Sequence, residues 1–539
     1  MNHFFKQSMR TLLTLILSFG LVGCANNKPS DQIVQNNINN ANIVNVGVTD
    51  SVSTLNPLLM NGGEVTKYAT GLMFLPLVEL NKDLSFDYFI ADSITTDDNL
   101  TFTVHVNPQA KWSDGTAVTA YDVEYTALRL CSPIIANTAM MYYVFEGVGE
   151  DGFVEPGATS IDGINVVDES TITFTCKQPM ALNTFMNSYA RYLMPLPKHM
   201  IENIAEEDLA SNAWFEKPTV VSGPYMLDSF DVDHYVSYTA NENYWLGKPS
   251  IEKLNIRIVD GAQLYAGLKS GEIDVTQQTM SVIPQEDYAS VESLNNVTAV
   301  YGDAITNQSL FINTSKVNDV KVRQALLYAI DRETLVSGLL EGHGEVVDGF
   351  LSSVSPYYDK TLVTTTYDPE KAKALLQEAN WDSSNKLVFY VNSGDTTMVN
   401  AANVLVAQWQ QVGINVEINT VDFATLMSVA GTKDYDLLAV QYTYPPIDPY
   451  TDINWLLSGE GSWTGYYDQS VSDALAATQT ESEDKLVDLY HVVSQKVQQD
   501  VPMISVYVIE ALAAVNNRMV NVTPSVYGLF NNVHQWSVQ

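Results

Sequence analysis

The stretch IADSITTDDNLTFTVHVNPQAKWSDGTAVTAYDVEYTAL, residues 90–128, decides the fold of this chain. Its segment LTFTVHV alternates apolar with polar side chains, and a period of two indicates a strand with one buried face. The apolar positions of that strand are Leu100, Phe102, Val104 and Val106. The stretch therefore begins with sheet structure.

A turn and a helix are predicted directly after this strand. The pair Asp114-Gly115 is typical of a tight turn. Thr119 stands before an apolar-periodic segment, where threonine is a favoured N-cap. His105 falls on the polar face of the strand, so we expect a surface histidine there and not a metal ligand.

The rest of the chain repeats this mixture of strands and helices. Residues 254–259 and 414–418 alternate like strands, whereas Asp319, Asp331 and Asp368 precede helical patterns as N-caps. Pro369 suits the first helical position after Asp368. The mixture predicts an α/β or α+β protein of several lobes. A length of 539 residues predicts two or three domains.

The start of the chain has the layout of a signal peptide. Lys6 and Arg10 precede a thirteen-residue apolar run that ends at Gly23. As a helix this run would be about 20 Å long, against roughly 30 Å of bilayer hydrocarbon. The polar, Asn-rich segment after Cys24 indicates a flexible tether. We therefore assign residues 1–23 to the signal peptide and residues 24–42 to the tether.

Cys24 follows the tripeptide Leu-Val-Gly, and LVGC resembles the bacterial lipobox. The resemblance implies that a diacylglycerol is attached to the Cys24 thiol and that the chain is cut before it. Two acyl chains hold a protein stably to a membrane. An ordinary signal peptide followed by an incidental cysteine is the alternative.

Charge and cysteine content narrow the function further. The net charge of −36 repels phosphate backbones, which excludes nucleic acid as a partner. Cys131 and Cys176 can pair in an oxidising compartment or remain as two buried free thiols, and the sequence does not decide between them.

Motifs of common enzymes and metal sites are absent from the sequence. It contains no H-E-x-x-H, P-loop, G-x-S-x-G or paired C-x-x-C. The stretch GVGEDG, residues 147–152, matches G-x-G-x-x-G but runs into turn-rich sequence where the motif needs a helix, so we interpret it as a loop. The seven histidines are scattered, so we expect neither a metal nor a cofactor. A carboxylate pair formed across the fold stays possible, which keeps a secreted hydrolase as a remote alternative.

Residues 90–128 resemble the signature of the oligopeptide- and dipeptide-binding proteins of bacterial ABC importers, extracellular solute-binding protein family 5. Six further segments follow in the order found in that family. They are SGPYML at Ser222, ENYWLGKPSIEKLNIRIV at Glu242, LKSGEIDV at Leu268, KVRQALLYAIDRETLV at Lys321, YDPEKAKALLQEANW at Tyr367 and VDFATL at Val421.

The resemblance implies an α/β fold of the type II periplasmic-binding-protein kind, a two-lobed clamp with an extra inserted α+β domain. Lobe I would be discontinuous, lobe II continuous, and the extra domain inserted into lobe I. The implied boundaries are 43–80, 216–300 and 503–539 for lobe I, 81–215 for the inserted domain, and 301–502 for lobe II.

The resemblance also implies where a ligand binds. Peptides in this family lie extended, with their main chains paired to protein backbone and their side chains in hydrated pockets. Asn56 belongs to a segment that resembles the first cleft loop, and Gln277 and Asn307 stand at strand ends that would face the cleft. We therefore expect Asn56, Gln277 and Asn307 to contact ligand.

One segment, VQYTYPPIDPYTDINWLLSG, departs from the family pattern. Well-known members of the family carry an aspartate four residues before the proline that matches Pro449, where it pairs with the α-ammonium group of the peptide. Here that position is Pro445, which has neither a charge nor an N–H group. Asp448 is a possible substitute. Aromatic side chains nearby either line the cleft or pack in the core of the lobe, and we take Tyr442, Tyr444 and Trp463 as candidates.

These observations lead to one main hypothesis and two alternatives. The chain is expected to be a monomeric, lipid-anchored receptor on the extracellular face of the cell membrane, or on its periplasmic side where an outer membrane exists. It would capture peptides and deliver them to the permease of an ABC transporter by clamp closure, without catalysis. The missing aspartate supports the alternative of a non-standard solute or a signalling peptide, and the hydrolase is the remote alternative.

Overall fold

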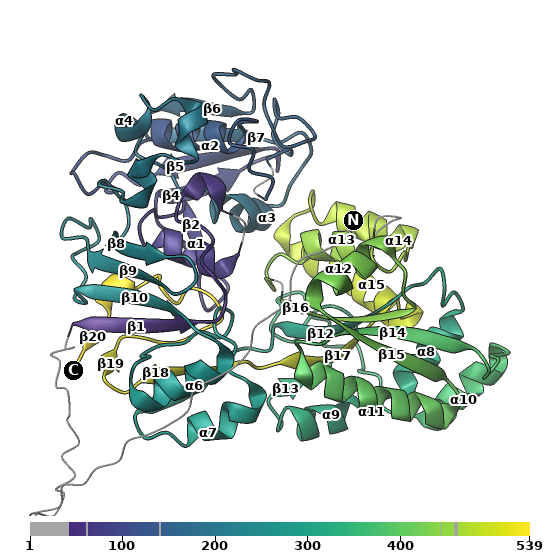
Figure 1. Cartoon of the computed structure of the whole chain (residues 1–539). Coiled ribbons are helices and arrows are strands. Elements are labelled where there is room, and N and C mark those ends of the chain that lie inside the picture. Colours follow the sequence, from purple (N-terminus) through teal and green to yellow (C-terminus); the bar gives the residue numbers. More distant parts are fainter. Residues whose placement is uncertain (1–41, 61–62, 140–141, 444, 458–461) are drawn as a thin grey trace, which may run out of the picture. The chain divides into compact units, whose positions relative to one another are not determined.

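The structure is a computed structural model that describes residues 42–60, 63–139, 142–443, 445–457 and 462–539 (Figure 1). The predicted signal peptide and the tether up to residue 41 lie outside the described residues. Among the described residues, no helix is both long and apolar enough to cross a bilayer.

Among the described residues, the strands form three larger sheets and three two-stranded ladders. The four-stranded sheets have the orders β1-β10-β9-β8 and β4-β5-β7-β6, and the six-stranded sheet has the order β13-β17-β12-β16-β14-β15. The short ladders are β2-β3, β11-β18 and β19-β20. The strands are β1 (Ile43–Val48), β2 (Val78–Leu80), β3 (Phe86–Tyr88), β4 (Ala91–Thr96), β5 (Thr101–Val106), β6 (Ile164–Asp168), β7 (Thr171–Thr175), β8 (Tyr225–Asp231), β9 (Tyr235–Ala240), β10 (Lys253–Ile258), β11 (Val297–Tyr301), β12 (Thr306–Ile312), β13 (Gly344–Glu345), β14 (Lys386–Asn392), β15 (Asn415–Val421), β16 (Leu437–Thr443), β17 (Met503–Ile509), β18 (Leu512–Asn516), β19 (Met519–Val520) and β20 (Ser537–Val538).

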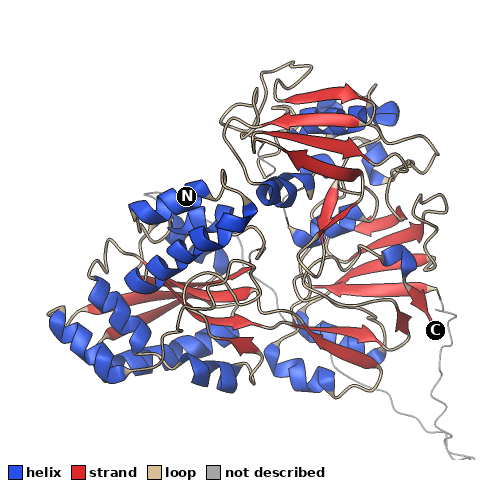
Figure 2. Cartoon of the chain, turned by 180° about the vertical axis from the view of Figure 1, so that it is seen from behind, coloured by secondary structure: helices blue, strands red, loops and turns tan. Residues whose placement is uncertain are grey.

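Helices cover these sheets and connect their strands (Figure 2). The α-helices are α1 (Glu64–Gly71), α2 (Ala120–Leu130), α3 (Leu182–Phe185), α4 (Lys198–Ile201), α5 (Glu206–Leu209), α6 (Gly261–Ser270), α7 (Tyr288–Glu292), α8 (Val320–Tyr328), α9 (Arg332–Leu339), α10 (Pro369–Glu378), α11 (Thr396–Val412), α12 (Phe423–Thr432), α13 (Tyr450–Leu457), α14 (Gln469–Ala477) and α15 (Glu483–Asp500).

The stretch quoted first forms the elements predicted for it. Its alternating segment is β5, in which Phe102, Val104 and Val106 are buried and His105 is exposed. Gly115 has a φ of 91°, which the predicted turn requires. Thr119 is the N-cap of α2, and its backbone N–H donates to Asp122 Oδ2 over 2.8 Å. The local pattern therefore fixed both elements and the turn between them.

The helix ends predicted elsewhere are also confirmed. Asp319, Asp331 and Asp368 are the N-caps of α8, α9 and α10, and each accepts a hydrogen bond from a backbone N–H of the following turn. Pro369 begins α10, as predicted. These helices begin where a short acidic side chain satisfies an otherwise unpaired N–H group.

Cys131 and Cys176 are both buried and both free. Of the two possibilities that the sequence leaves open, the structure therefore has the pair of free thiols. Burial raises the pKa of each thiol to about 12, which keeps both protonated and unreactive.

The six-stranded sheet is buried on both faces. Its central strands send apolar side chains to alternate sides, and helices cover each side. Leu310 and Ile312 of β12 pack in a core with α8, α9, α10 and α11. Phe311, between them in sequence, packs in a second core with α12, α13, α14 and α15. A sheet covered on both faces is typical of an α/β architecture.

The four-stranded sheet of β1 shares one large core with the sheet of β5. Val44 and Val46 of β1, Phe102 of β5 and Trp112 belong to the same buried cluster. Val275 bridges β1 to β18, so the β11-β18 ladder continues this part of the molecule.

Two short segments connect the β11-β18 ladder to the six-stranded sheet. The chain passes from β11 to β12 through residues 302–305 and returns from β17 to β18 through residues 510–511. The two segments lie side by side, since Gly302 N donates to Ala511 O over 3.0 Å. The predicted start of the last lobe I segment, residue 503, coincides with the first residue of β17, which pairs with β12. We propose to place that boundary after Ile509.

Gly223, in the segment SGPYML, is expected to tolerate no side chain. A Cβ atom there would lie 2.4 Å from the carbonyl oxygen of Leu72, a backbone atom that cannot move aside without shifting α1. We expect Gly223→Ala to lower the free energy of unfolding by about 1–3 kcal/mol.

Gly431, an exposed residue of α12, is the matched control. A Cβ there meets no atom of the described residues within 4 Å, and alanine favours helix by up to about 1 kcal/mol. Denaturant unfolding of both variants tests the prediction, and equal stability of the Gly223→Ala variant and the parent would contradict it.

Candidate ligand-binding site

A cavity of about 620 Å³ is lined by residues far apart in the sequence. They come from α1, from residues 139–192, from residues 442–452 and from the C-terminal segment. We call it the acidic cavity, because three carboxylates line it beside tyrosines and a single arginine. Its main lining residues are Glu64, Tyr142, Asn187, Tyr189, Arg191, Tyr192, Thr279, Tyr442, Thr443, Pro445, Asp448, Asp452 and Tyr527.

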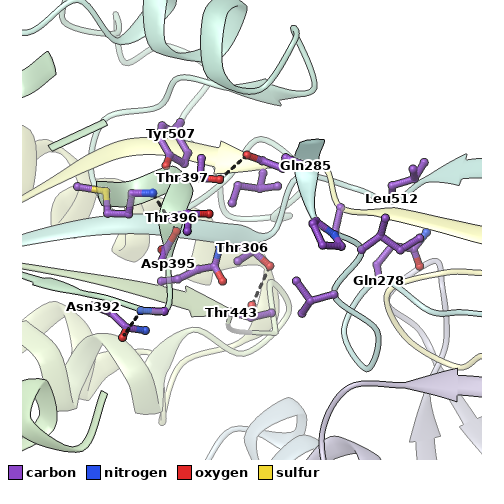
Figure 3. A pocket seen from close by; sticks show the side chains of 18 of the residues that line it. Gln278, Gln285, Thr306, Asn392, Asp395, Thr396, Thr397, Thr443, Tyr507 and Leu512 are labelled. Carbon is purple, nitrogen blue, oxygen red and sulfur yellow. Dashed lines mark hydrogen bonds between the residues drawn. The ribbon is translucent and has the colours of Figure 1, made fainter. Parts of the chain in front are cut away.

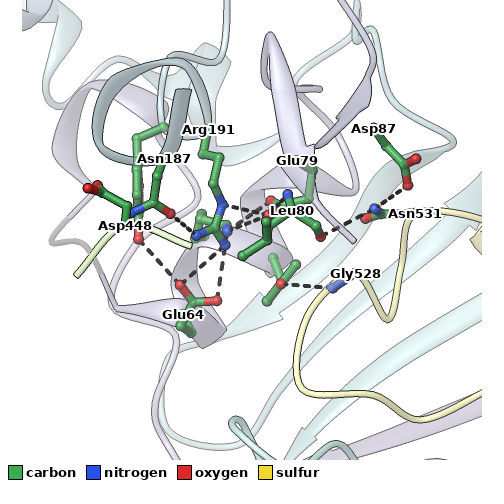
Figure 4. A network of polar contacts seen from close by, with 12 residues as sticks. Glu64, Glu79, Leu80, Asp87, Asn187, Arg191, Asp448, Gly528 and Asn531 are labelled. Carbon is green, nitrogen blue, oxygen red and sulfur yellow. Dashed lines mark hydrogen bonds and ion pairs between the residues drawn. The ribbon is translucent and has the colours of Figure 1, made fainter. Parts of the chain in front are cut away.

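A buried ion cluster supports one wall of the acidic cavity (Figure 4). Glu79 accepts from Lys67 Nζ at 2.8 Å and from Arg191 Nε at 2.8 Å, and all three side chains are at most 5% exposed. Burial alone would raise the pKa of the Glu79 carboxyl, but Arg191 and Lys67 hold it below its ordinary value. Glu64 adds a second carboxylate, 3.7 Å from Lys67 and 3.8 Å from Arg191.

This cluster extends to the opposite wall of the cavity through Asn187. Arg191 Nη1 donates to Asn187 Oδ1 over 2.9 Å, and Asn187 Nδ2 donates to Asp448 Oδ2 over 3.3 Å. Thr184 Oγ1 donates to the other oxygen of Asp448 over 2.8 Å. Burial raises the pKa of Asp448, and these hydrogen bonds oppose that effect.

Asp452, in the first turn of α13, is a second carboxylate on that wall. Tyr442 of β16 donates its hydroxyl hydrogen to Asp452 Oδ1. Burial raises the pKa of Asp452 to about 6, and the neighbouring charge of Asp448 acts in the same direction. The Asp452 carboxyl can therefore change its charge near neutral pH.

A second cavity, of about 500 Å³, has a mixed lining of polar and apolar residues with two acids, Glu286 and Asp395 (Figure 3). We call it the amide cavity, because most of its polar lining residues carry hydroxyl or carboxamide groups, among them Gln278, Gln285, Thr306, Asn392, Thr396, Thr397, Gln441 and Tyr507. Thr397 Oγ1 donates to Gln285 Oε1 over 2.9 Å, which links the N-terminus of α11 to the segment before α7. Such groups can pair with backbone amides of a ligand.

The two cavities meet, because Thr279 and Thr443 line both of them. Thr279 lies in the segment between α6 and α7, and Thr443 is the last residue of β16. A ligand that occupies both cavities would therefore contact both the part of the chain near β1 and the six-stranded sheet.

Tyr442 and Asp448, two of the residues predicted from sequence, line the acidic cavity together. Pro445, the position where the family carries an aspartate, lies in the same wall. Cys24 and Tyr444 lie outside the described residues.

The other predicted residues have side chains engaged within the protein. Asn56 caps a short 3-10 helix and also donates to Leu209 O over 3.3 Å. Trp463 packs edge-to-face against Phe311 in the core. Gln277 donates to Val526 O over 2.7 Å, and Asn307 accepts from Ser309 over 3.1 Å. Among the described residues, Gln277 Oε1 and Asn307 Nδ2 have no hydrogen-bond partner.

Several lining residues were not predicted, and most of them gave no sequence signal. Glu64, Tyr142 and Tyr527 reach the cavity from three segments that are far apart in the sequence, so no local pattern marks them. Asp452 had a weak signal, since it follows Asp448 by four residues and α13 begins between them. Within the described part of the chain, no three His, Cys, Asp or Glu side chains are placed to hold a metal ion.

Comparison with known proteins agrees with this architecture. The sequence model described as "Bacterial extracellular solute-binding proteins, family 5 Middle" matches residues 88–464. This chain belongs to that family, and it is a solute-binding protein with the two-lobed α/β fold of its members.

Individual relatives share less than a third of their residues with this chain. A Brucella ovis protein described as an ABC transporter peptide-binding protein is 29% identical over 350 residues, which cover 62% of this chain and 61% of that protein. The oligopeptide-binding protein AppA of Bacillus subtilis is 25% identical over 455 residues, covering 80% and 79% of the two chains.

Solved structures share the fold at lower identity. The substrate-binding protein CtaP of Listeria monocytogenes has a TM-score of 0.78 and 22% identity, covering 92% of this chain and 99% of that one. AppA of Bacillus subtilis in complex with a nonapeptide has a TM-score of 0.71 and 22% identity, with the same coverage.

Neutralising Glu79 is expected to destabilise the protein strongly. In Glu79→Gln, Lys67 and Arg191 lose the carboxylate that both contact, and breaking a buried ion pair in this way costs about 3–5 kcal/mol. The exposed pair Lys386–Glu417 provides the control, because Glu417→Gln should cost less than about 1 kcal/mol. Denaturant unfolding measures both, and equal losses in the two variants would contradict the prediction.

Proposed function

We propose that this chain captures peptides outside the cell and delivers them to the permease of an ABC importer. Membership of a solute-binding family supports the receptor role. The names of the Brucella and Bacillus relatives support a peptide as the solute, and the AppA structure contains a nonapeptide. The observation that carries the proposal is the pair of joined cavities. Their walls come both from the part of the chain near β1 and from the six-stranded sheet with its helices.

The proposed mechanism is clamp closure about a bound ligand. A ligand that contacts both lobes stabilises the closed state over the open one, whereas a ligand that contacts a single lobe shifts nothing. Residues 302–305 and 510–511 are the proposed hinges, because short connecting segments absorb the backbone change in such motions. The permease would recognise the closed form. The proposed lobes and the inserted domain keep the boundaries given in the sequence analysis, with one change. Strand β17 (Met503–Ile509) is assigned to lobe II and no longer to lobe I.

A second candidate function is a receptor for a non-standard solute or a signalling peptide. Pro445 favours it, because the cavity wall there offers neither a charge nor an N–H group to an α-ammonium group. Asp448 and Asp452 in the same cavity keep recognition of an amine possible by another route.

We also propose that the mature protein is a monomer anchored to the outer face of the cell membrane through lipid on Cys24. The lipobox-like LVGC and the polar segment after it support the anchor.

Peptide binding is expected to be measurable by isothermal titration with a mixed tetrapeptide library. Heat should appear, and small-angle scattering should show a more compact protein with ligand. Thr443→Trp places an indole where the cavities meet and should weaken binding about tenfold or more, a difference of about 1.4 kcal/mol per decade. Thr432→Trp, at the exposed end of α12, serves as the control. Absence of heat with every free-amine peptide would reject the first candidate in favour of the second.

Lipid attachment is expected to depend on Cys24. Cells that express the parent chain should incorporate radioactive palmitate into it, and cells that express Cys24→Ala should not, because the thiol is the proposed acceptor. Cys131→Ala is a suitable control, since that thiol is buried. Equal labelling of the parent and the Cys24→Ala chain would refute the anchor.

A further inference from the structure

The joined cavities have an excess of negative charge. Glu64, Asp448 and Asp452 line the acidic cavity, and Glu286 and Asp395 line the amide cavity. Among the described lining residues, the one cationic side chain is Arg191. The gaps in the description between residues 42 and 539 contain no Lys, Arg or His in their sequence.

Arg191 is already committed within the protein. Its Nε donates to Glu79, its Nη1 donates to Asn187, and its Nη2 lies 3.8 Å from Glu64. Nη2 makes no hydrogen bond within the described residues, but Glu79 and Glu64 balance the charge of the guanidinium, so a free carboxylate on a ligand would have to compete with both of them. No other described lining residue offers it a positive charge.

Residues that line both cavities also carry buried polar atoms without hydrogen-bond partners, independently of the acids. Tyr142 lines the acidic cavity at 1% exposure, and its hydroxyl has no hydrogen-bond partner among the described residues. The same is true of the Tyr507 hydroxyl and of Gln278 Oε1 in the amide cavity. Buried polar groups rarely remain unpaired, so these atoms are hydrogen-bonding groups beside the cavities that the described residues leave unsatisfied.

The tyrosines of the acidic cavity suit a cation in a second way. Tyr142, Tyr189, Tyr192, Tyr442 and Tyr527 all line it. An ammonium or guanidinium group is attracted to the face of an aromatic ring and more strongly when it is desolvated. Carboxylates and aromatic rings together make a site for an organic cation.

We propose that the joined cavities select cationic solutes, holding a positively charged group of the ligand beside Asp452 and Asp448 and disfavouring ligands with a free carboxylate. This proposal rests on the proposed peptide function and specifies its substrate class as basic peptides or peptide-like amines.

The ionisation of Asp452 gives the site a pH dependence. Its pKa is raised to about 6 by burial and by Asp448, with Tyr442 and Tyr527 as further titratable neighbours. A cation binds the ionised carboxylate, which forms as the pH rises through the pKa. Affinity for a cationic ligand should therefore increase from roughly pH 5 to pH 7.

The test uses one tetrapeptide library in four end forms, measured by isothermal titration with the purified chain. The forms are free amine with amide, free amine with carboxylate, acetyl with amide, and acetyl with carboxylate. The first form carries a positive charge on its amine and no negative charge at its amide end. It should bind about tenfold more tightly than the second form, because the carboxylate of the second form meets the negative charge of the cavity. Equal affinity for these two forms would overturn the proposal while leaving peptide binding intact.

Asp452→Asn removes the charge but keeps a side chain that can accept from Tyr442. It should weaken binding of the cationic form about tenfold and change binding of the acetyl-amide form by less than about threefold. It should also abolish the rise in affinity with pH. Asp473→Asn, on the exposed face of α14, removes the same charge from the protein and should have no such effect. Equal effects of the two variants would show that the preference comes from the overall charge of the protein, and this result would overturn the proposed cation site.

Failure of all four forms to bind would reject the peptide function but not the charge preference. In that case the charge preference is tested by measuring the thermal unfolding temperature of the protein with spermidine, agmatine or succinate. Stabilisation by the two amines alone would support a cationic solute, and no stabilisation by either amine would overturn it.

Discussion

The carboxylate of Glu79 is the interaction on which the ligand-binding part of this structure depends. Lys67 and Arg191 are buried almost completely, and neither could remain charged there without a neutralising partner. Glu79 lies 2.8 Å from both, and it also accepts from the N–H of Leu80 over 2.8 Å. With its guanidinium fixed in this way, Arg191 can hold Asn187, and Asn187 in turn holds Asp448. One buried charge therefore positions side chains on two walls of the acidic cavity.

The cavity combines acids that are neutralised with acids that are not. Glu64 and Glu79 are balanced by Lys67 and Arg191, whereas Asp448 receives hydrogen bonds from neutral donors and Asp452 from Tyr442. This difference explains the direction of the pKa shifts, because Glu79 is lowered by its cations while the two aspartates are raised by burial. A protein that places such carboxylates in a cavity wall leaves part of its electrostatic balance to a ligand.

Local structure could be predicted well from the sequence, and the candidate site only in part. The strand with Phe102 and Val104, the cap at Thr119 and the helix start at Asp368 depend on residues within one turn or one strand, so their patterns were sufficient. Tyr442 and Asp448, which the sequence indicated because one stretch departs from the family pattern at Pro445, both line the acidic cavity. Asn56 and Trp463 show the opposite case, since a polar or aromatic side chain of the right type can serve a helix cap or a core equally well.

The sequence by itself determined the periodic elements, because apolar spacing and capping act over a few residues, and its ordered motifs indicated the class of protein through their resemblance to a known family. It also determined the overall excess of acids. Only the tertiary structure decided which acids remain without a cation, that Cys131 and Cys176 stay free, and that Glu64, Asp452 and Tyr527 share one cavity. The physical reason is that desolvation and charge pairing depend on distances in space, and these are set by strands and loops that are hundreds of residues apart along the chain.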